Sequence, residues 1–129
     1  MSEKVIKNWL SLAEYDLQTA KAMFITNRYL YVAFTCQQAI EKLLKAIYVK
    51  EKNETPPYTH NLIKLVSLVS ISSIIDEDKI RFIEILNSYY IESRYTEEID
   101  ELSQILTKER TKEILSETER VFLWLKEKI

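Results

Sequence analysis

The sequence contains no glycine, only two prolines and a single cysteine among its 129 residues. Sheet proteins normally need glycine in their hairpin turns, whereas helices can end on asparagine. The missing glycine therefore favours an all-α fold. The prolines, Pro56 and Pro57, are adjacent and mark one clear loop. The lone Cys36 has no partner for an intramolecular disulfide, which is typical of a reducing compartment, and we interpret it as a small buried hydrophobe.

A strong net charge and long apolar runs are also missing. The formal net charge is −2, so no overall basic field attracts the protein to nucleic acid. No stretch approaches the roughly 18 apolar residues of a membrane span, and the N-terminal segment lacks the apolar core of a signal peptide. We expect a cytoplasmic protein without membrane contact. His60 is the only histidine and has no zinc ligands at suitable spacing, so we expect no metal site.

The clearest pattern that is present covers residues 31–50. Val32, Cys36, Ala39, Leu43 and Ile47 recur at helical spacing, and this predicts a long helix at the centre of a bundle. One group of side chains interrupts the apolar surface, and we call it the polar band. It is either the solvated face of the helix or a site. The polar band consists of Gln37, Gln38, Glu41, Lys42 and Lys45.

Other helical patterns flank this segment. A first helix is expected to end at Asn27, a third to begin near residues 59–62, a fourth to follow Asp76, and a last one to follow Thr107. Residues 96–104 are acidic and are interpreted as a linker or an irregular lid. The sequence thus predicts a single domain, residues 1–129, folded as an antiparallel bundle of about five helices.

Four of these segments resemble the HEPN family, the higher eukaryotes and prokaryotes nucleotide-binding domains. The match comprises a first-helix pattern with Trp9 and Ala13, the pattern QQAxEKxLKA over residues 37–46, HxLxxL over residues 60–65, and YxxxRY over residues 90–95. The last motif places Arg94 at the end of the fourth helix. The resemblance implies a five-helix domain that commonly forms homodimers. It also implies a small nucleotidyltransferase as protein partner, in a two-component or toxin–antitoxin pair.

The family's known chemistry is metal-independent RNA cleavage by an R-x4-6-H motif. In that motif Arg contacts the phosphate and His transfers a proton. The chain supplies Arg94, but the positions for His hold Ile99, Asp100 and Glu101. An acid there repels a phosphodiester. This departure weighs against an enzyme, and the catalytic residues stay unassigned, with Arg94 and His60 as the candidates.

The candidate site residues come from the polar band and the end of the fourth helix. Lys42 and Lys45 each have a simpler interpretation as partners in helix ion pairs, such as Glu41 with Lys45. Asp16 is either an exposed acid or the partner of Arg94. The resemblance favours a nucleotide- or anion-binding set of Lys42, Lys45, Arg94 and Tyr95, supported by Asp16, Gln37, Gln38 and Glu41.

Two functions remain open. The first is a non-catalytic nucleotide-binding or interaction module, without a cofactor other than a nucleotide ligand. The second is a ribonuclease toxin that uses Arg94 and could use His60, with RNA as its substrate. Eight tyrosines, four phenylalanines and two tryptophans favour a homodimer, and Tyr89, Tyr90 and Tyr95 are expected at its interface.

Overall fold

The computed structural model describes residues 3–90 and 96–129, which form six α-helices and one 3-10 helix, η1, and no strand. The predicted all-α fold is therefore confirmed. The helices, in chain order, are α1 (Glu3–Ile25), α2 (Tyr29–Lys52), α3 (Leu62–Ser67), η1 (Ser70–Ser73), α4 (Glu77–Asn87), α5 (Thr96–Ile105) and α6 (Lys108–Lys126).

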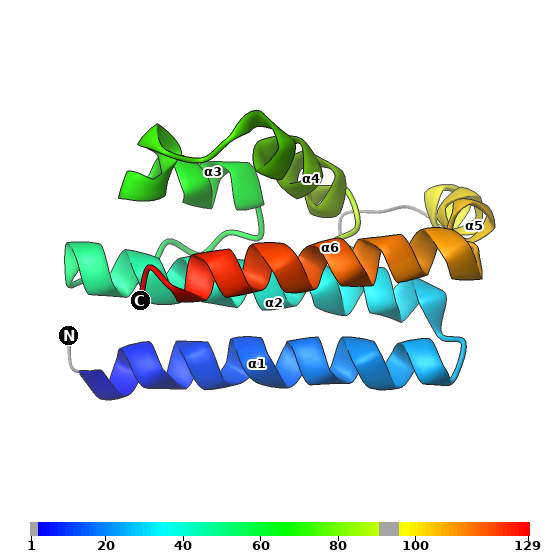
Figure 1. Ribbon diagram of the computed structural model, residues 1–129, viewed down its shortest axis with the longest axis horizontal. Helices are drawn as coiled ribbons and strands as arrows, with labels where there is room; N and C mark the ends of the chain where they lie inside the picture. The colour runs from blue at the N-terminus through cyan, green and yellow to red at the C-terminus, as the bar shows by residue number, and fades with distance from the viewer. Residues whose placement is uncertain (1–2, 91–95) are drawn as a thin grey trace.

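Helix α2 lies at the centre of the molecule (Figure 1). It runs antiparallel to α1, and the connection between them is short because Asn27 adopts a left-handed conformation, with φ of 63°. Helix α6 lies along α2 and runs in the same direction, while α3 and α4 lie on the side of α2 away from α1. Helix α2 is thus covered on several sides, as its wide apolar surface predicts.

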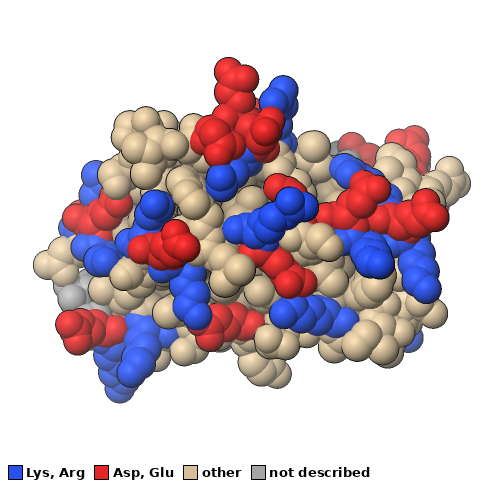
Figure 2. All heavy atoms as spheres, in the orientation of Figure 1, with Lys and Arg blue, Asp and Glu red and all other residues tan. Residues whose placement is uncertain are grey.

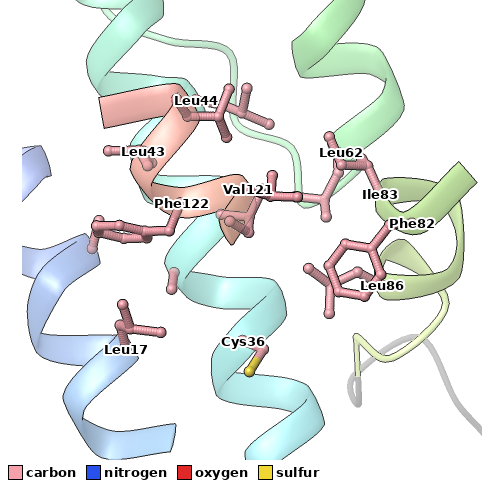
Figure 3. Close-up of a cluster of buried hydrophobic side chains, with 14 of the residues drawn as sticks. Leu17, Cys36, Leu43, Leu44, Leu62, Phe82, Ile83, Leu86, Val121 and Phe122 are labelled. Carbon is pink, nitrogen blue, oxygen red and sulfur yellow. The ribbon is translucent and has the colours of Figure 1, made fainter. Parts of the chain in front are cut away.

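The core is built around the apolar surface of α2. Ile40, Leu43 and Leu44 are fully buried. Figure 3 shows Leu43 and Leu44 among side chains from α1, α3, α4 and α6, including Leu17 of α1 and Phe122 of α6. Burial of such side chains stabilises a fold by roughly 1.5–3 kcal/mol each, so this surface holds the bundle together.

Short polar side chains begin three of the helices. Asn61 accepts from the backbone N–H groups of Ile63 and Lys64 at the start of α3. Asp76 and Thr107 cap α4 and α6 in the same way, as the sequence predicts. These caps satisfy N–H groups that have no partner within the helix.

Two expected boundaries are wrong. Helix α4 was expected to continue through Arg94 but ends at Asn87, because the N–H groups of Ser88 and Tyr89 turn back to the carbonyls of Ile85 and Leu86. Tyr90 therefore lies beyond the helix. Residues 96–104, interpreted above as a linker or lid, belong to α5, since the segment is amphipathic and buries Leu102.

The surface carries charges of both signs. On the face shown in Figure 2, acidic and basic side chains are interspersed, and neither sign forms a separate large area. Along α6 the ion pairs Arg110–Glu113 and Arg120–Glu117 contribute to this pattern. Within the described residues, no helix is long and apolar enough to cross a membrane.

Candidate functional site

The polar band of α2 lies mostly inside the protein. Gln37 is 0% exposed, Glu41 3% and Lys45 6%, so these three side chains do not form a solvated face. Buried polar and charged groups destabilise a fold unless each has a hydrogen-bond or ion-pair partner. The partners of the polar band therefore determine what the band can do.

Lys45 is held by two contacts. Its Nζ lies 3.1 Å from Oε2 of Glu41, one turn earlier on α2, and 5.6 Å from the ring centroid of Trp9 on α1. The ammonium is thus paired with a buried carboxylate and also faces an aromatic ring. The ion-pair interpretation of Glu41 and Lys45 agrees with this geometry, and Lys45 has no charge left over for a ligand.

Lys42 is paired as well. Its Nζ donates to Oδ2 of Asp16 over 2.6 Å, which joins α2 to α1. Asp16 therefore has a tertiary partner, and among the described residues that partner is Lys42. As the two proposed anion-binding lysines each contact a carboxylate, neither offers an unbalanced positive charge.

Glu41 connects the polar band to His60. Oε1 of Glu41 lies 2.8 Å from Nδ1 of His60, and Gln37 donates through Nε2 to the His60 carbonyl over 2.9 Å. Gln38 donates to both Gln37 and Glu41, at 2.7 and 3.3 Å. Gln37, Gln38, Glu41 and His60 thus belong to one network, in which the side chain of His60 joins the loop before α3 to α2.

The imidazole of His60 is also fixed by aromatic rings. It stacks on Tyr90 with centroids 4.1 Å apart and planes 19° apart, and Tyr58 meets it edge-on at 5.6 Å. Tyr90 is itself buried and contacts Phe34 of α2. A ring held by a carboxylate on one edge and by an aromatic face has little rotational freedom.

A pocket of about 260 Å³ opens beside this ring, lined by His60, Asn61, Asn87 and Tyr90. Asn87 is placed by two hydrogen bonds, since its Oδ1 accepts from the Leu62 N–H at 2.7 Å and its Nδ2 donates to Asn61 at 3.2 Å. Periodicity does not reveal either asparagine as a site residue, because an asparagine at a helix end is already explained by capping. The hydrogen bond between Asn61 and Asn87 joins two segments that are distant in the sequence, so no local pattern predicts it.

The remaining site predictions have different outcomes. Arg94 and Tyr95 lie outside the described residues, so their predicted roles stay predictions. Tyr89 and Tyr90 are buried within the chain at 5% and 8% exposure, and their expected place in a dimer interface is wrong. Both pack inward because α4 ends before them.

Cys36 is fully buried on α2, and burial raises the pKa of its thiol to about 12, which agrees with its interpretation as a buried hydrophobe. No group of three or more His, Cys, Asp or Glu side chains in the described parts of the chain is arranged to hold a metal ion.

Helical architecture and a polar site between α2, α3 and the end of α4 define a small helical domain, and the comparisons place it in a family. The model of the HEPN domain matches residues 6–129, so the chain belongs to the HEPN family. Membership supports a nucleotide-interacting or RNase-type module. The crystal structure of TT1696 from Thermus thermophilus has the same fold, with a TM-score of 0.81 at 22% identity over 96% of this chain and 98% of that one. No curated protein matches the sequence.

Proposed function

We propose that the chain is a nucleotide-binding HEPN module without a catalytic activity of its own, and that a small nucleotidyltransferase is its partner in the cytoplasm. The observation that carries the binding role is the pocket beside His60, where a fixed aromatic edge meets two asparagine side chains. Nucleotide sites commonly combine an aromatic surface with a few well-placed polar groups.

The number of proton-transfer groups supports binding over catalysis. Acid–base cleavage of RNA needs one group to take a proton from the nucleophile and another to protonate the leaving oxygen. Among the described residues that line the pocket, His60 alone has a side chain that ordinarily titrates near neutral pH. The sequence after Arg94 adds Asp100 and Glu101 where the ribonuclease motif has His.

One observation favours the alternative, a ribonuclease. The 2.8 Å contact between Glu41 and His60 orients the imidazole as a carboxylate orients a catalytic histidine in hydrolases. His60 would then handle the proton and Arg94, four residues after Tyr90 in the sequence, would contact the phosphate. Growth arrest on overexpression, with cellular RNA examined on a gel, tests this activity. Loss of both effects in His60→Gln and Arg94→Ala would establish the ribonuclease, whereas intact RNA with wild-type protein would exclude it.

Binding is tested by calorimetric titration of the purified chain with AMP, ATP and adenosine. We expect binding by wild type, and loss of it in Asn87→Leu, which removes both polar atoms of a pocket side chain. The matched control is Gln104→Leu, which makes the same kind of change at an exposed position of α5. If none of the three ligands binds wild type, the nucleotide-binding role is wrong.

The proposed partners require separate measurements. Co-purification from the native organism should recover a nucleotidyltransferase, and its absence from repeated preparations would contradict the pairing. For the homodimer, the exposed aromatic side chains Tyr15 (72%), Tyr31 (52%) and Tyr58 (93%) are better interface candidates than the buried tyrosines. Light scattering should give twice the monomer mass at micromolar concentration, and Tyr31→Ser should weaken the association.

A further inference from the structure

The pocket beside His60 has unused hydrogen-bond donors. Oδ1 of Asn61 accepts from the N–H groups of Ile63 and Lys64, at 3.1 and 3.2 Å, and Oδ1 of Asn87 accepts from the Leu62 N–H. Because main-chain N–H groups can only donate, they establish which end of each amide is oxygen. Both amide oxygens are therefore engaged with the protein.

The amide nitrogens are left for a ligand. Nδ2 of Asn87 uses one of its hydrogens on Oδ1 of Asn61, over 3.2 Å. Among the described residues, the other hydrogen of Asn87 and both hydrogens of the Asn61 amide have no acceptor. Three N–H donors from two adjacent side chains thus border one pocket, and a ligand that satisfies them must present acceptor oxygens.

His60 completes this arrangement. Its Nδ1 faces the carboxylate of Glu41, and Nε2 has no partner in the described part of the chain. In the neutral ring Nε2 is an acceptor, but in the imidazolium both nitrogens donate. The groups that contact the ring are Glu41 of the polar band, Tyr58 and Tyr90, and the charged group next to them is Lys45, which pairs with Glu41.

The charges of these groups decide which ligand fits. The carboxylate of Glu41 is already balanced by the ammonium of Lys45, at 3.1 Å. Protonation of His60 therefore leaves one carboxylate, Glu41, between two cations, so that the three groups carry a net charge of +1 next to the three N–H donors. An anion with several acceptor oxygens would both neutralise the imidazolium and accept from the amides.

We propose that His60, Asn61 and Asn87 form a subsite for a tetrahedral oxyanion, and that His60 takes up a proton when the anion binds. This inference rests on the proposed nucleotide-binding function and deepens it, since the phosphate group of a nucleotide is the source of such an oxyanion inside a larger ligand. Free phosphate or sulfate has the same chemistry and occupies the same subsite.

Sulfate is the sharpest first probe because it remains a dianion across the pH range in which imidazole titrates. Calorimetric titrations of the full chain should show sulfate affinity that falls at least about tenfold between pH about 5.5 and about 8, as the imidazolium is lost. Titrations at one pH near neutrality, in buffers of different ionisation enthalpy, should show net proton uptake on binding. An affinity independent of pH, without proton uptake, overturns the coupling.

The matched variants are Asn61→Asp and Gln18→Glu. Asp at position 61 keeps the acceptor that caps α3 but replaces the N–H donors with a second carboxylate oxygen. We expect sulfate and AMP affinities to fall at least about tenfold with the melting temperature nearly unchanged. Gln18→Glu makes the same charge change at an exposed position of α1 and should leave both affinities within about twofold. Equal affinities in Asn61→Asp and wild type overturn the subsite.

His60→Asn tests the proton uptake by His60 independently. Its amide can still donate to Glu41 but lacks the second ring nitrogen, so both the pH dependence and the proton uptake should disappear.

Comparison with adenosine, which has no phosphate, separates the oxyanion subsite from nucleotide binding in general. If AMP and adenosine bind equally well and Asn61→Asp changes neither affinity, the oxyanion subsite is wrong while nucleotide binding stands. If none of the ligands binds, both are wrong.

Discussion

The apolar surface of α2 and three members of its polar band, Gln37, Glu41 and Lys45, are nearly equally buried, but their contacts differ in kind. Leu43 is 0% exposed and Glu41 3%. Leu43 packs among many neighbours and needs no particular one, whereas Glu41 makes directional contacts to Lys45, His60 and Gln38. Burial of the band therefore depends on every partner being present, and loss of one partner leaves another group unsatisfied.

The largest expected effect is the removal of Glu41. Glu41→Ala leaves the 6%-exposed ammonium of Lys45 without its carboxylate, and we expect the free energy of unfolding to fall by about 3–5 kcal/mol. Urea denaturation monitored by circular dichroism measures it. The control is the double variant Glu41→Leu with Lys45→Met, which removes both charges and should recover most of the loss. A single variant as stable as wild type would show that the polar band does not depend on pairing.

Next in size is a truncation on the apolar surface. Leu43→Ala removes buried methyl groups and leaves a cavity, so the free energy of unfolding should fall by about 2–5 kcal/mol. The same denaturation experiment applies. Leu43→Met keeps most of the volume and should cost less than about 1.5 kcal/mol. A cost below about 0.5 kcal/mol for the alanine variant would contradict the central position of α2.

A smaller effect is expected where the polar site meets a helix end. Asn61→Ala removes the cap of α3, and we expect a loss of about 0.5–2 kcal/mol in thermal or urea unfolding. Asn61→Asp keeps the capping acceptor and serves as the matched control, with stability close to that of wild type. Equal losses in the two variants would mean that the amide group of Asn61, rather than its capping oxygen, stabilises α3.

The smallest effect belongs to the pair that is partly open to water. The side chains of Lys42 and Asp16 are 22% and 17% exposed, and ion pairs near the surface contribute about 0.2–1 kcal/mol. Asp16→Asn should therefore destabilise far less than Glu41→Ala. Added salt should bring the stability of Asp16→Asn still closer to that of wild type, because it screens the ion pair. A loss comparable with that of Glu41→Ala would place this pair energetically inside the core.

The sequence predicts the apolar surface of α2 but not the burial and the partners of its polar band. The helical spacing of Leu43 and its neighbours predicts the apolar surface of α2, and Asn27, Asp76 and Thr107 predict helix ends from local chemistry. Whether Glu41 is solvated or buried depends on where the loop before α3 passes, which periodicity does not encode. The pairing of Asp16 with Lys42 cannot be predicted from periodicity either, since only the packing of α1 on α2 brings the two residues together.

The end of α4 illustrates a second limit. A helical pattern continues past Asn87 in the sequence, but the Asn87 side chain bonds to the N–H of Leu62, and Tyr90 stacks on His60. These tertiary contacts override the local preference. The pocket of the candidate site exists because of that early end. Two of the family motifs begin at residues that line it, His60 and Tyr90, but neither motif indicates a pocket, and Asn87 has no sequence signal.

The short connection between α1 and α2 also has a consequence for how the chain folds. Three residues, 26–28, separate two long helices, so the entropy lost in bringing them together is small. Helix α6 reaches α2 only after more than fifty intervening residues have been placed between Lys52 and Lys108. We expect the α1–α2 hairpin to form in the folding nucleus and α6 to dock late. Truncations in the hairpin should then slow refolding, whereas truncations in α6 should mainly accelerate unfolding.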